Sequence, residues 1–224
     1  MLLRVRVALP DRPGSLGQVA RTLGVAGADI VQVIVLERLG GRAIDDFTVV
    51  WPGGSGVERL RAGLAAMPGV RVDGIWRAIG SPVSGGHDAE LLAQVAAKPA
   101  DGLSTLVDAV PGLLAADWAA VLTVQADWAT RRMPPEVLYR SWRAPAELDL
   151  PEITPLRPRA MTGRDETRYA LVPFGYDGLV LAVARTADDE LPVAAFHATE
   201  VDRLAQIVRA ASVMVSQAFA IATE

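Results

Sequence analysis

The order of strand-like and helix-like patterns over the first 80 residues constrains the fold more than any other feature of the chain. The stretch LLRVRVALP, residues 2–10, alternates apolar residues with arginine and alanine. This period of two is typical of a strand with one buried face. From Leu16 the apolar residues recur every three or four positions until GVAG at 24–27, which predicts a helix.

Two more strands, a second helix and a fourth strand follow in the same region. The strands are predicted at 29–37, 43–51 and 70–79, and the helix between 57 and 67. The resulting order, strand, helix, strand, strand, helix, strand, predicts a ferredoxin-like βαββαβ domain over residues 1–79. Its antiparallel four-stranded sheet would carry both helices on one face and leave the other face and the edges free for self-association.

The glycine-rich stretch 80–87 interrupts both periodicities and is predicted to be a linker. Beyond it, residues 88–224 read as two helices, four short strands ending in a hairpin at YDG (176–178), and a long terminal helix from about Thr199. Four prolines between 144 and 159 predict a long loop draped over the sheet. The whole chain is thus expected to be α+β, with a second domain built of an antiparallel sheet and flanking helices.

Charge and cysteine content exclude several classes of function. With 22 basic and 26 acidic residues the formal net charge is -4, so no diffuse positive field would attract nucleic acid. The absence of cysteine excludes disulfides, thiolate nucleophiles and iron–sulfur ligation, and fits a reducing cytoplasm. No stretch approaches the roughly 20 apolar residues of a membrane span, so a soluble, untargeted protein without membrane contact is expected.

The sequences LPDRPGSL at 9–16, GADI at 27–30 and MPGV at 67–70 resemble an ACT domain over residues 1–79. This family of small regulatory modules binds amino acids in several biosynthetic enzymes. The resemblance implies ligand binding at the loop between the first strand and the first helix. The implied binding residues are Asp11, Arg12, Pro13, Gly14, Ser15, Leu16, Asp29 and Ile30.

The loop itself offers a physical reason for such a site. Gly14 permits close approach of the backbone, and unpaired N–H groups at a helix start attract a carboxylate. An ammonium group would then meet Asp11 or, from a neighbouring subunit, Asp29. Family members commonly carry asparagine, which both donates and accepts hydrogen bonds, at the positions of Asp11 and Asp29. The two carboxylates of this chain only accept hydrogen bonds and favour a cation, so a basic or amine ligand is an alternative to a neutral amino acid. The alternative is a purely structural turn in which Asp11 caps the helix.

The second half resembles a GAF-like domain through RYALVPFGYDGLVLAVAR and the terminal FHATEVDRLAQIVRAAS. Such modules bind nucleotides, chromophores or metabolites, or only dimerise, so the resemblance names no ligand. The tryptophans of this half line either a pocket or, more commonly, a core. They are Trp118, Trp128 and Trp142.

No catalytic or metal-binding constellation emerges. His87 and His197 stand about 110 positions apart, and the acidic Glu200 and Asp202 after His197 fit a helix start better than a site. The acid pair Asp45–Asp46 is expected on a solvated turn or strand end. No cofactor and no metal are expected.

These observations predict a non-catalytic, ligand-sensing protein that binds a small molecule, an amino acid by resemblance, and forms a homodimer. Its output would require a separate, unknown protein partner. Two alternatives remain: an assembly module without a ligand, and an enzyme, which would need an acid–base pair that the sequence does not supply.

Overall fold

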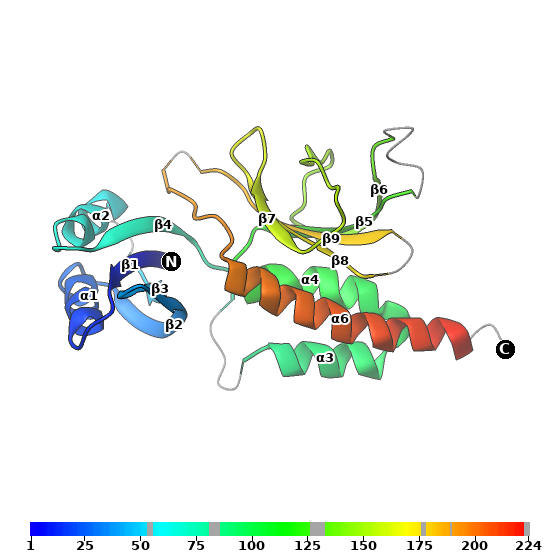
Figure 1. The fold of residues 1–224 in the computed structure, drawn as a ribbon, viewed down its shortest axis with the longest axis horizontal. Coiled ribbons are helices and arrows are strands. Elements are labelled where there is room, and N and C mark those ends of the chain that lie inside the picture. The colour runs from blue at the N-terminus through cyan, green and yellow to red at the C-terminus, as the bar shows by residue number, and fades with distance from the viewer. Residues whose placement is uncertain (53–55, 81–85, 126–132, 176–177, 189, 222–224) are drawn as a thin grey trace. The chain divides into compact units, whose positions relative to one another are not determined.

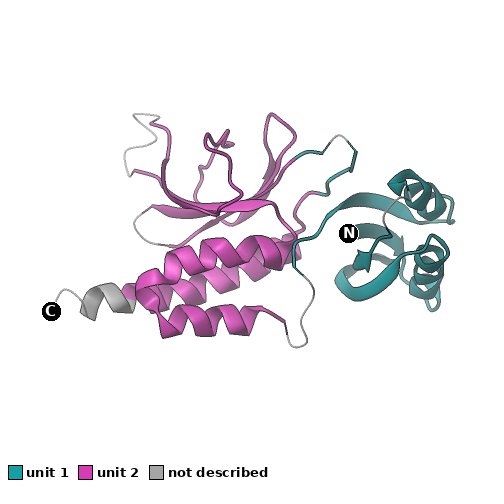
Figure 2. Cartoon of the chain, turned by 180° about the vertical axis from the view of Figure 1, so that it is seen from behind, with its two compact units in different colours: residues 1–82, 187–194 teal, residues 83–186, 195–224 magenta. Residues whose placement is uncertain are grey.

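The computed structural model describes residues 1–52, 56–80, 86–125, 133–175, 178–188 and 190–221, with the side chains of 217–221 left out. Most of the expected linker, Trp128 and the hairpin residues 176–177 lie outside this part of the chain. Packing divides the chain into two compact units (Figure 2). Unit 1 comprises Met1–Pro82 and Ala187–Ala194, and unit 2 comprises Val83–Thr186 and Ala195–Glu224. Residues 187–194, which the sequence pattern assigned to the second domain, therefore group with unit 1.

Unit 1 has the expected βαββαβ order. Its elements are β1 (Leu2–Pro10), α1 (Ser15–Val25), β2 (Asp29–Leu39), β3 (Arg42–Val50), α2 (Val57–Ala65) and β4 (Arg71–Arg77). The strands form one antiparallel sheet in the order β2-β3-β1-β4, and Figure 1 shows both helices on one face of it. The predicted α+β class and ferredoxin-like topology are confirmed.

The core of unit 1 lies between the sheet and its two helices. The apolar residues of β1 that alternate in the sequence, such as Val5 and Val7, are fully buried there against Val19 of α1 and Leu60 of α2. Leu191, from the segment that follows β9 of unit 2, joins the same core and is 4% exposed.

That segment runs along β4, at the edge of the sheet. The main-chain N–H of Ile75 donates to the carbonyl oxygen of Pro192 at 2.8 Å. A Cβ at Gly74 would stand 2.6 Å from the nitrogen of Ala194, so this close approach requires glycine. Unit 1 is thus completed by residues more than a hundred positions downstream.

Unit 2 is a five-stranded antiparallel sheet in the order β6-β5-β9-β8-β7, with three helices on one face (Figure 1). Its elements are α3 (Asp88–Ala97), η1 (Pro99–Asp101), α4 (Gly102–Leu114), β5 (Trp118–Thr123), β6 (Glu136–Arg140), β7 (Arg159–Thr162), β8 (Arg168–Pro173), β9 (Leu179–Arg185) and α6 (Ala198–Ile221). The antiparallel sheet with flanking helices agrees with the prediction, whereas the short strand β7 was not predicted.

Both faces of this sheet are apolar. The helices cover one face, where Val121, Leu181 and Val183 are fully buried. On the other face Ile153, from the proline-rich loop, packs against Trp118 and Tyr169, as the expected draped loop would. In the described part of the chain no helix combines the length and the apolar character needed to cross a membrane.

Candidate functional site

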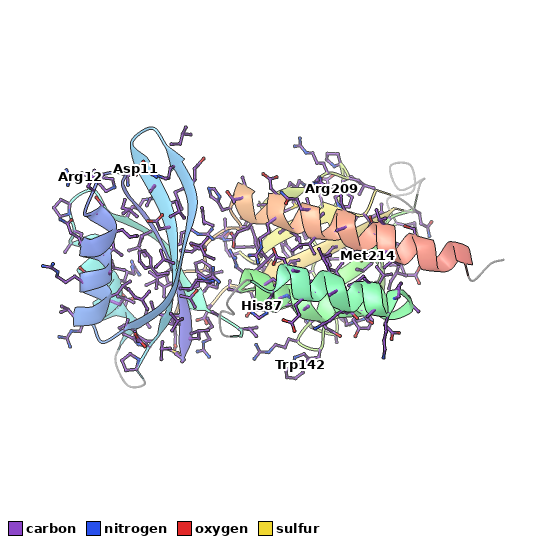
Figure 3. The ribbon with its side chains drawn as sticks, turned by 90° about the horizontal axis from the view of Figure 1, so that it is seen from below. Asp11, Arg12, His87, Trp142, Arg209 and Met214 are labelled. Atoms are coloured by element: carbon purple, nitrogen blue, oxygen red, sulfur yellow. The ribbon has the colours of Figure 1, made fainter. Side chains whose placement is uncertain are left out.

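The loop between β1 and α1 brings the first six predicted residues together, at the end of the sheet where β1 stops. Figure 3 shows Asp11 and Arg12 beside the start of α1. The main chain is fixed by Asp11 N–H, which donates to Gly41 O at 2.8 Å, and by Ser15 N–H, which donates to Arg12 O at 3.2 Å. Gly14 has φ 90°, a left-handed conformation that favours glycine.

The helix that follows this loop begins without a side-chain cap. α1 starts at Ser15, no side chain makes a capping hydrogen bond to it, and its first turn contains no acidic residue. The first-turn N–H groups and the helix dipole therefore favour an anionic partner from outside the helix. The sequence left open whether Asp11 caps α1, and the structure gives Asp11 a different partner.

Asp11 is held by Arg38 at the end of β2. The Arg38 Nη2 atom donates to Asp11 Oδ1 at 2.7 Å, and Nε lies 3.1 Å from both carboxylate oxygens. This bond to Asp11 raises the pKa of Arg38 above its usual value. The charge of Asp11 is therefore compensated by Arg38. Because the two residues are 27 positions apart, no local sequence pattern indicates this ion pair.

The expectation that Asp45 and Asp46 lie on a solvated turn or strand end is wrong. Both residues lie in the middle of β3 and are 2% and 1% exposed. Asp45 pairs with Val7 of β1 and Val35 of β2, and shares the helix-covered face of the sheet with Phe47. Its Oδ1 atom is buried without a hydrogen-bond partner. Burial, and then the negative charges of Asp11 and Asp46, raise the pKa of this carboxyl.

Asp46 points to the opposite face of the sheet and is fully paired. Arg6 donates to both of its carboxylate oxygens, at 2.7 and 2.8 Å, and Arg4 approaches it at 3.4 Å. The Arg6 guanidinium also lies 5.3 Å from the centre of the Trp76 ring. The two adjacent aspartates therefore differ in pairing: both oxygens of Asp46 accept hydrogen bonds, whereas Asp45 Oδ1 has no partner.

Apolar side chains remain exposed next to the loop. Leu16 on α1 is 42% exposed, and Val33 and Val35 of β2 are 39% and 50% exposed. The two valines pair with Phe47 and Asp45 and so belong to the helix-covered face of the sheet. A small ligand with an aliphatic side chain would find an apolar surface here.

The last two predicted residues lie elsewhere in the same chain. Asp29 and Ile30 begin β2, whereas the β1–α1 loop adjoins its far end. At about 3.3 Å per residue, about 30 Å of strand separates Asp29 from that loop. Ile30 packs against the core cluster of unit 1. Asp29 can complete the loop only from another copy of the chain.

Among the candidates of unit 2, Glu200 and Trp118 have structural roles. Glu200 accepts a hydrogen bond from the His197 main-chain N–H at 2.8 Å and forms a buried ion pair with Arg185, so this group caps α6. Trp118 is buried edge-on against Tyr169, whereas Trp142 is 88% exposed (Figure 3). Within the described ranges no cluster of three or more His, Cys, Asp or Glu residues could hold a metal ion.

Unit 2 also contains a cavity of about 310 Å³ at the free edge of its sheet. It lies between residues 149–152 of the proline-rich loop and residues 161–164 of β7 and the following turn. Neighbouring polar groups are already engaged: Tyr169 donates to the carbonyl of Asp149 at 2.8 Å, and Arg168 donates to the hydroxyl of Thr162 at 2.9 Å.

Comparison with known proteins identifies no family. No family model matches the chain, and no curated protein matches it. Among solved structures it resembles the regulatory subunit of aspartate kinase from Thermus thermophilus, with 14% identity, a TM-score of 0.29, and coverage of 97% of this chain and 92% of that one. A GAF domain assigned to a sensor histidine kinase of Pseudomonas syringae pv. tomato shares 10% identity at a TM-score of 0.42, over 61% of this chain and 90% of that one.

A formyltetrahydrofolate deformylase from Pseudomonas putida KT2440 shares 19% identity at a TM-score of 0.31. That match covers 44% of this chain and 39% of the deformylase, so this chain spans about two fifths of its length. All three TM-scores lie below 0.5. Any function must therefore be argued from the residues of this chain.

Proposed function

We propose that the chain is a non-catalytic sensor that binds a small amino acid at the β1–α1 loop, where two copies meet through β2. The observation that carries this proposal is the start of α1, which follows the left-handed Gly14 and has no side-chain cap. Because the Ser15 N–H already donates to Arg12 O, the N–H groups that follow it in the first turn would bind the carboxylate of the amino acid. The charges of Asp11 and Arg38 cancel, and Arg12 leaves the loop with one net positive charge, which favours the carboxylate end of an amino acid.

The edge strand β2 supports association with a second copy. It forms one border of the sheet and is 11 residues long. Val31, Val33 and Val35 along it are 39–50% exposed. Because an exposed apolar edge strand is a template for pairing with another strand, a second β2 is the simplest partner. Antiparallel pairing about the middle of β2 would set Asp29 of the partner subunit near Arg38.

In such a dimer the ligand would act by population shift. An amino acid held between one copy's loop and the other copy's β2 favours the paired arrangement over the separated one. The effect on the equilibrium is limited by the difference in affinity between the two states. A separate protein that distinguishes these states would read the signal.

A thermal-shift screen of the full chain against the twenty amino acids tests the binding site. A ligand at about 100 times its Kd adds about 2.7 kcal/mol to the stability, and so raises the Tm. Gly14→Val should abolish this rise, because a β-branched residue cannot keep φ 90°. Gly175→Val is the matched control, since Gly175 of unit 2 also has φ 90° and open space around it. If Gly14→Val kept the ligand-induced rise in Tm, the amino acid would bind at another place on the chain.

Sedimentation analysis tests the dimer. Replacing both Val33 and Val35 by Lys should give monomers, because the two cations would face their copies across the paired edge. Val213→Lys, at an exposed position of α6, is the control and should leave the dimer intact. Dimers without any amino acid binding would instead identify an assembly module.

A further inference from the structure

Asp45 is the one carboxylate on the core face of the unit 1 sheet whose position a structural role does not explain, among the residues that the structure describes. It stands between the fully buried Val7 and the half-exposed Val35. Taking a carboxylate out of water without pairing it costs several kcal/mol. The Oδ1 atom of Asp45 has no hydrogen-bond partner to offset that cost.

Its neighbour Asp46 shows what a structural aspartate looks like in the same strand. Asp46 accepts two hydrogen bonds from Arg6 and is 1% exposed. Asp45 is equally buried, and Arg38, whose charge acts on it, donates its hydrogen bonds to Asp11. The two residues differ in pairing rather than in burial.

The location of Asp45 connects it to the β1–α1 loop. Asp45 lies two residues along β3 from Ala43, which pairs with Leu9 of β1 and with Arg38 of β2, and the charges of Asp11 and Arg38 both act on its carboxyl. Val35, beside it on the same face, is 50% exposed, and Arg38 exposes 66% of its side chain. In the register of the sheet, the half-exposed Val35 stands between Asp45 and the β2 edge, where the ligand is proposed to bind.

The geometry points to Asp45 as the group that receives the protonated amine of the ligand. This assignment rests on the proposed function and adds the residue that selects an amine. A carboxylate oxygen only accepts hydrogen bonds, and an ammonium group supplies the donor that Asp45 Oδ1 lacks, together with a positive charge. The carboxylate of the same ligand would lie at the start of α1, which has the opposite preference.

Calorimetric titration of the full-length chain and of Asp45→Asn separates the two ends of the ligand. The probes are the twenty amino acids, isobutylamine, which has an amine and no carboxylate, and isovalerate, which has a carboxylate and no amine. Each amino acid that binds the wild type should bind Asp45→Asn at least about tenfold more weakly, because a charged hydrogen bond is lost. Any binding of isobutylamine should weaken too, and any binding of isovalerate should not.

Asp73→Asn is the matched control. Asp73 lies on β4, where it accepts from Arg71 at 2.6 Å, and its loss should leave every affinity unchanged. Equal amino-acid affinities for the wild type and Asp45→Asn would overturn the assignment while leaving the proposed function standing. A wild-type chain that binds none of the twenty amino acids would remove the proposed function, and the role of Asp45 with it.

Discussion

The start of α6 in unit 2 and the middle of β3 in unit 1 each bury a carboxylate, and the two carboxylates differ in their hydrogen-bond partners. Glu200 at the start of α6 accepts hydrogen bonds from Arg185 Nη2 at 2.5 Å and from the His197 main-chain N–H at 2.8 Å. Asp45 in β3 has a buried oxygen with no partner. Burial alone therefore does not distinguish the two carboxylates, whereas the missing hydrogen-bond partner of Asp45 requires a separate explanation.

Arg185 shows how complete the compensation in unit 2 is. Besides Glu200, its guanidinium donates to the carbonyls of Leu114 and Ala115, at 2.6 and 3.2 Å, where α4 ends in a left-handed residue. It also lies 4.0 Å from the centre of the Phe196 ring. This one side chain therefore joins the ends of α4, β9 and α6, and its role is structural.

The largest effect is expected from Arg185→Met. Removing one partner of a buried ion pair leaves Glu200 uncompensated and should lower the free energy of unfolding by about 3–5 kcal/mol. Urea titration of the full chain measures this. Adding Glu200→Gln should recover part of the loss, and a single-variant loss below about 1 kcal/mol would show that the pair does not stabilise unit 2.

The two glycines with φ 90° compare the units directly. Alanine at Gly14 or at Gly175 meets no atom within 4 Å, so the cost is conformational and should be about 1–2 kcal/mol in each case. Only Gly14→Ala should also weaken amino-acid binding, as measured by calorimetry. If both variants weakened binding equally, the loss would reflect general instability and the β1–α1 loop would lose its distinction.

Asp45→Asn is expected to act in the opposite direction to Arg185→Met. Removing an uncompensated buried charge should raise the free energy of unfolding at pH 7 by about 1 kcal/mol, less than the full desolvation cost because the amide is also polar. The same urea titration measures it. A loss of stability comparable to that of Arg185→Met would place Asp45 among the structural carboxylates.

The smallest effect is the pH dependence of that difference. Burial raises the pKa of Asp45 in the folded chain above its ordinary value of 3.8, so the folded state binds the proton more tightly than the unfolded state. Lowering the pH through the raised pKa therefore stabilises the wild type relative to Asp45→Asn. The gap between the two should be greatest at neutral pH and vanish below about pH 4. A constant gap between pH 7 and 4 would contradict the raised pKa.

Local patterns predicted unit 1 well because its strands and helices alternate residue types in the expected way. The alternation around Val5 and the stripe around Val19 both correspond to core positions. β7 was not predicted because it has only four residues and follows a proline-rich loop. It is a strand because it pairs with β8, and a local sequence pattern does not show this pairing.

The site was predicted less completely than the fold. The loop from Asp11 to Leu16 has a recognisable sequence, but two adjacent aspartates in a strand resemble a solvated turn when their neighbours are unknown. Arg6 pairs with Asp46 and Val7 lies beside Asp45, and both neighbours are about 40 positions away in the sequence. The pairing of Arg38 with Asp11 is hidden for the same reason.

Amide chemical-shift mapping of the full-length protein, titrated with the twenty amino acids one at a time, tests whether an amino acid binds at the β1–α1 loop and Asp45. An amino acid that binds there should shift the amide signals of Gly14–Gly17 and of Asp45 together. Shifts confined to residues 149–152 and 161–164, around the cavity of unit 2, would contradict it.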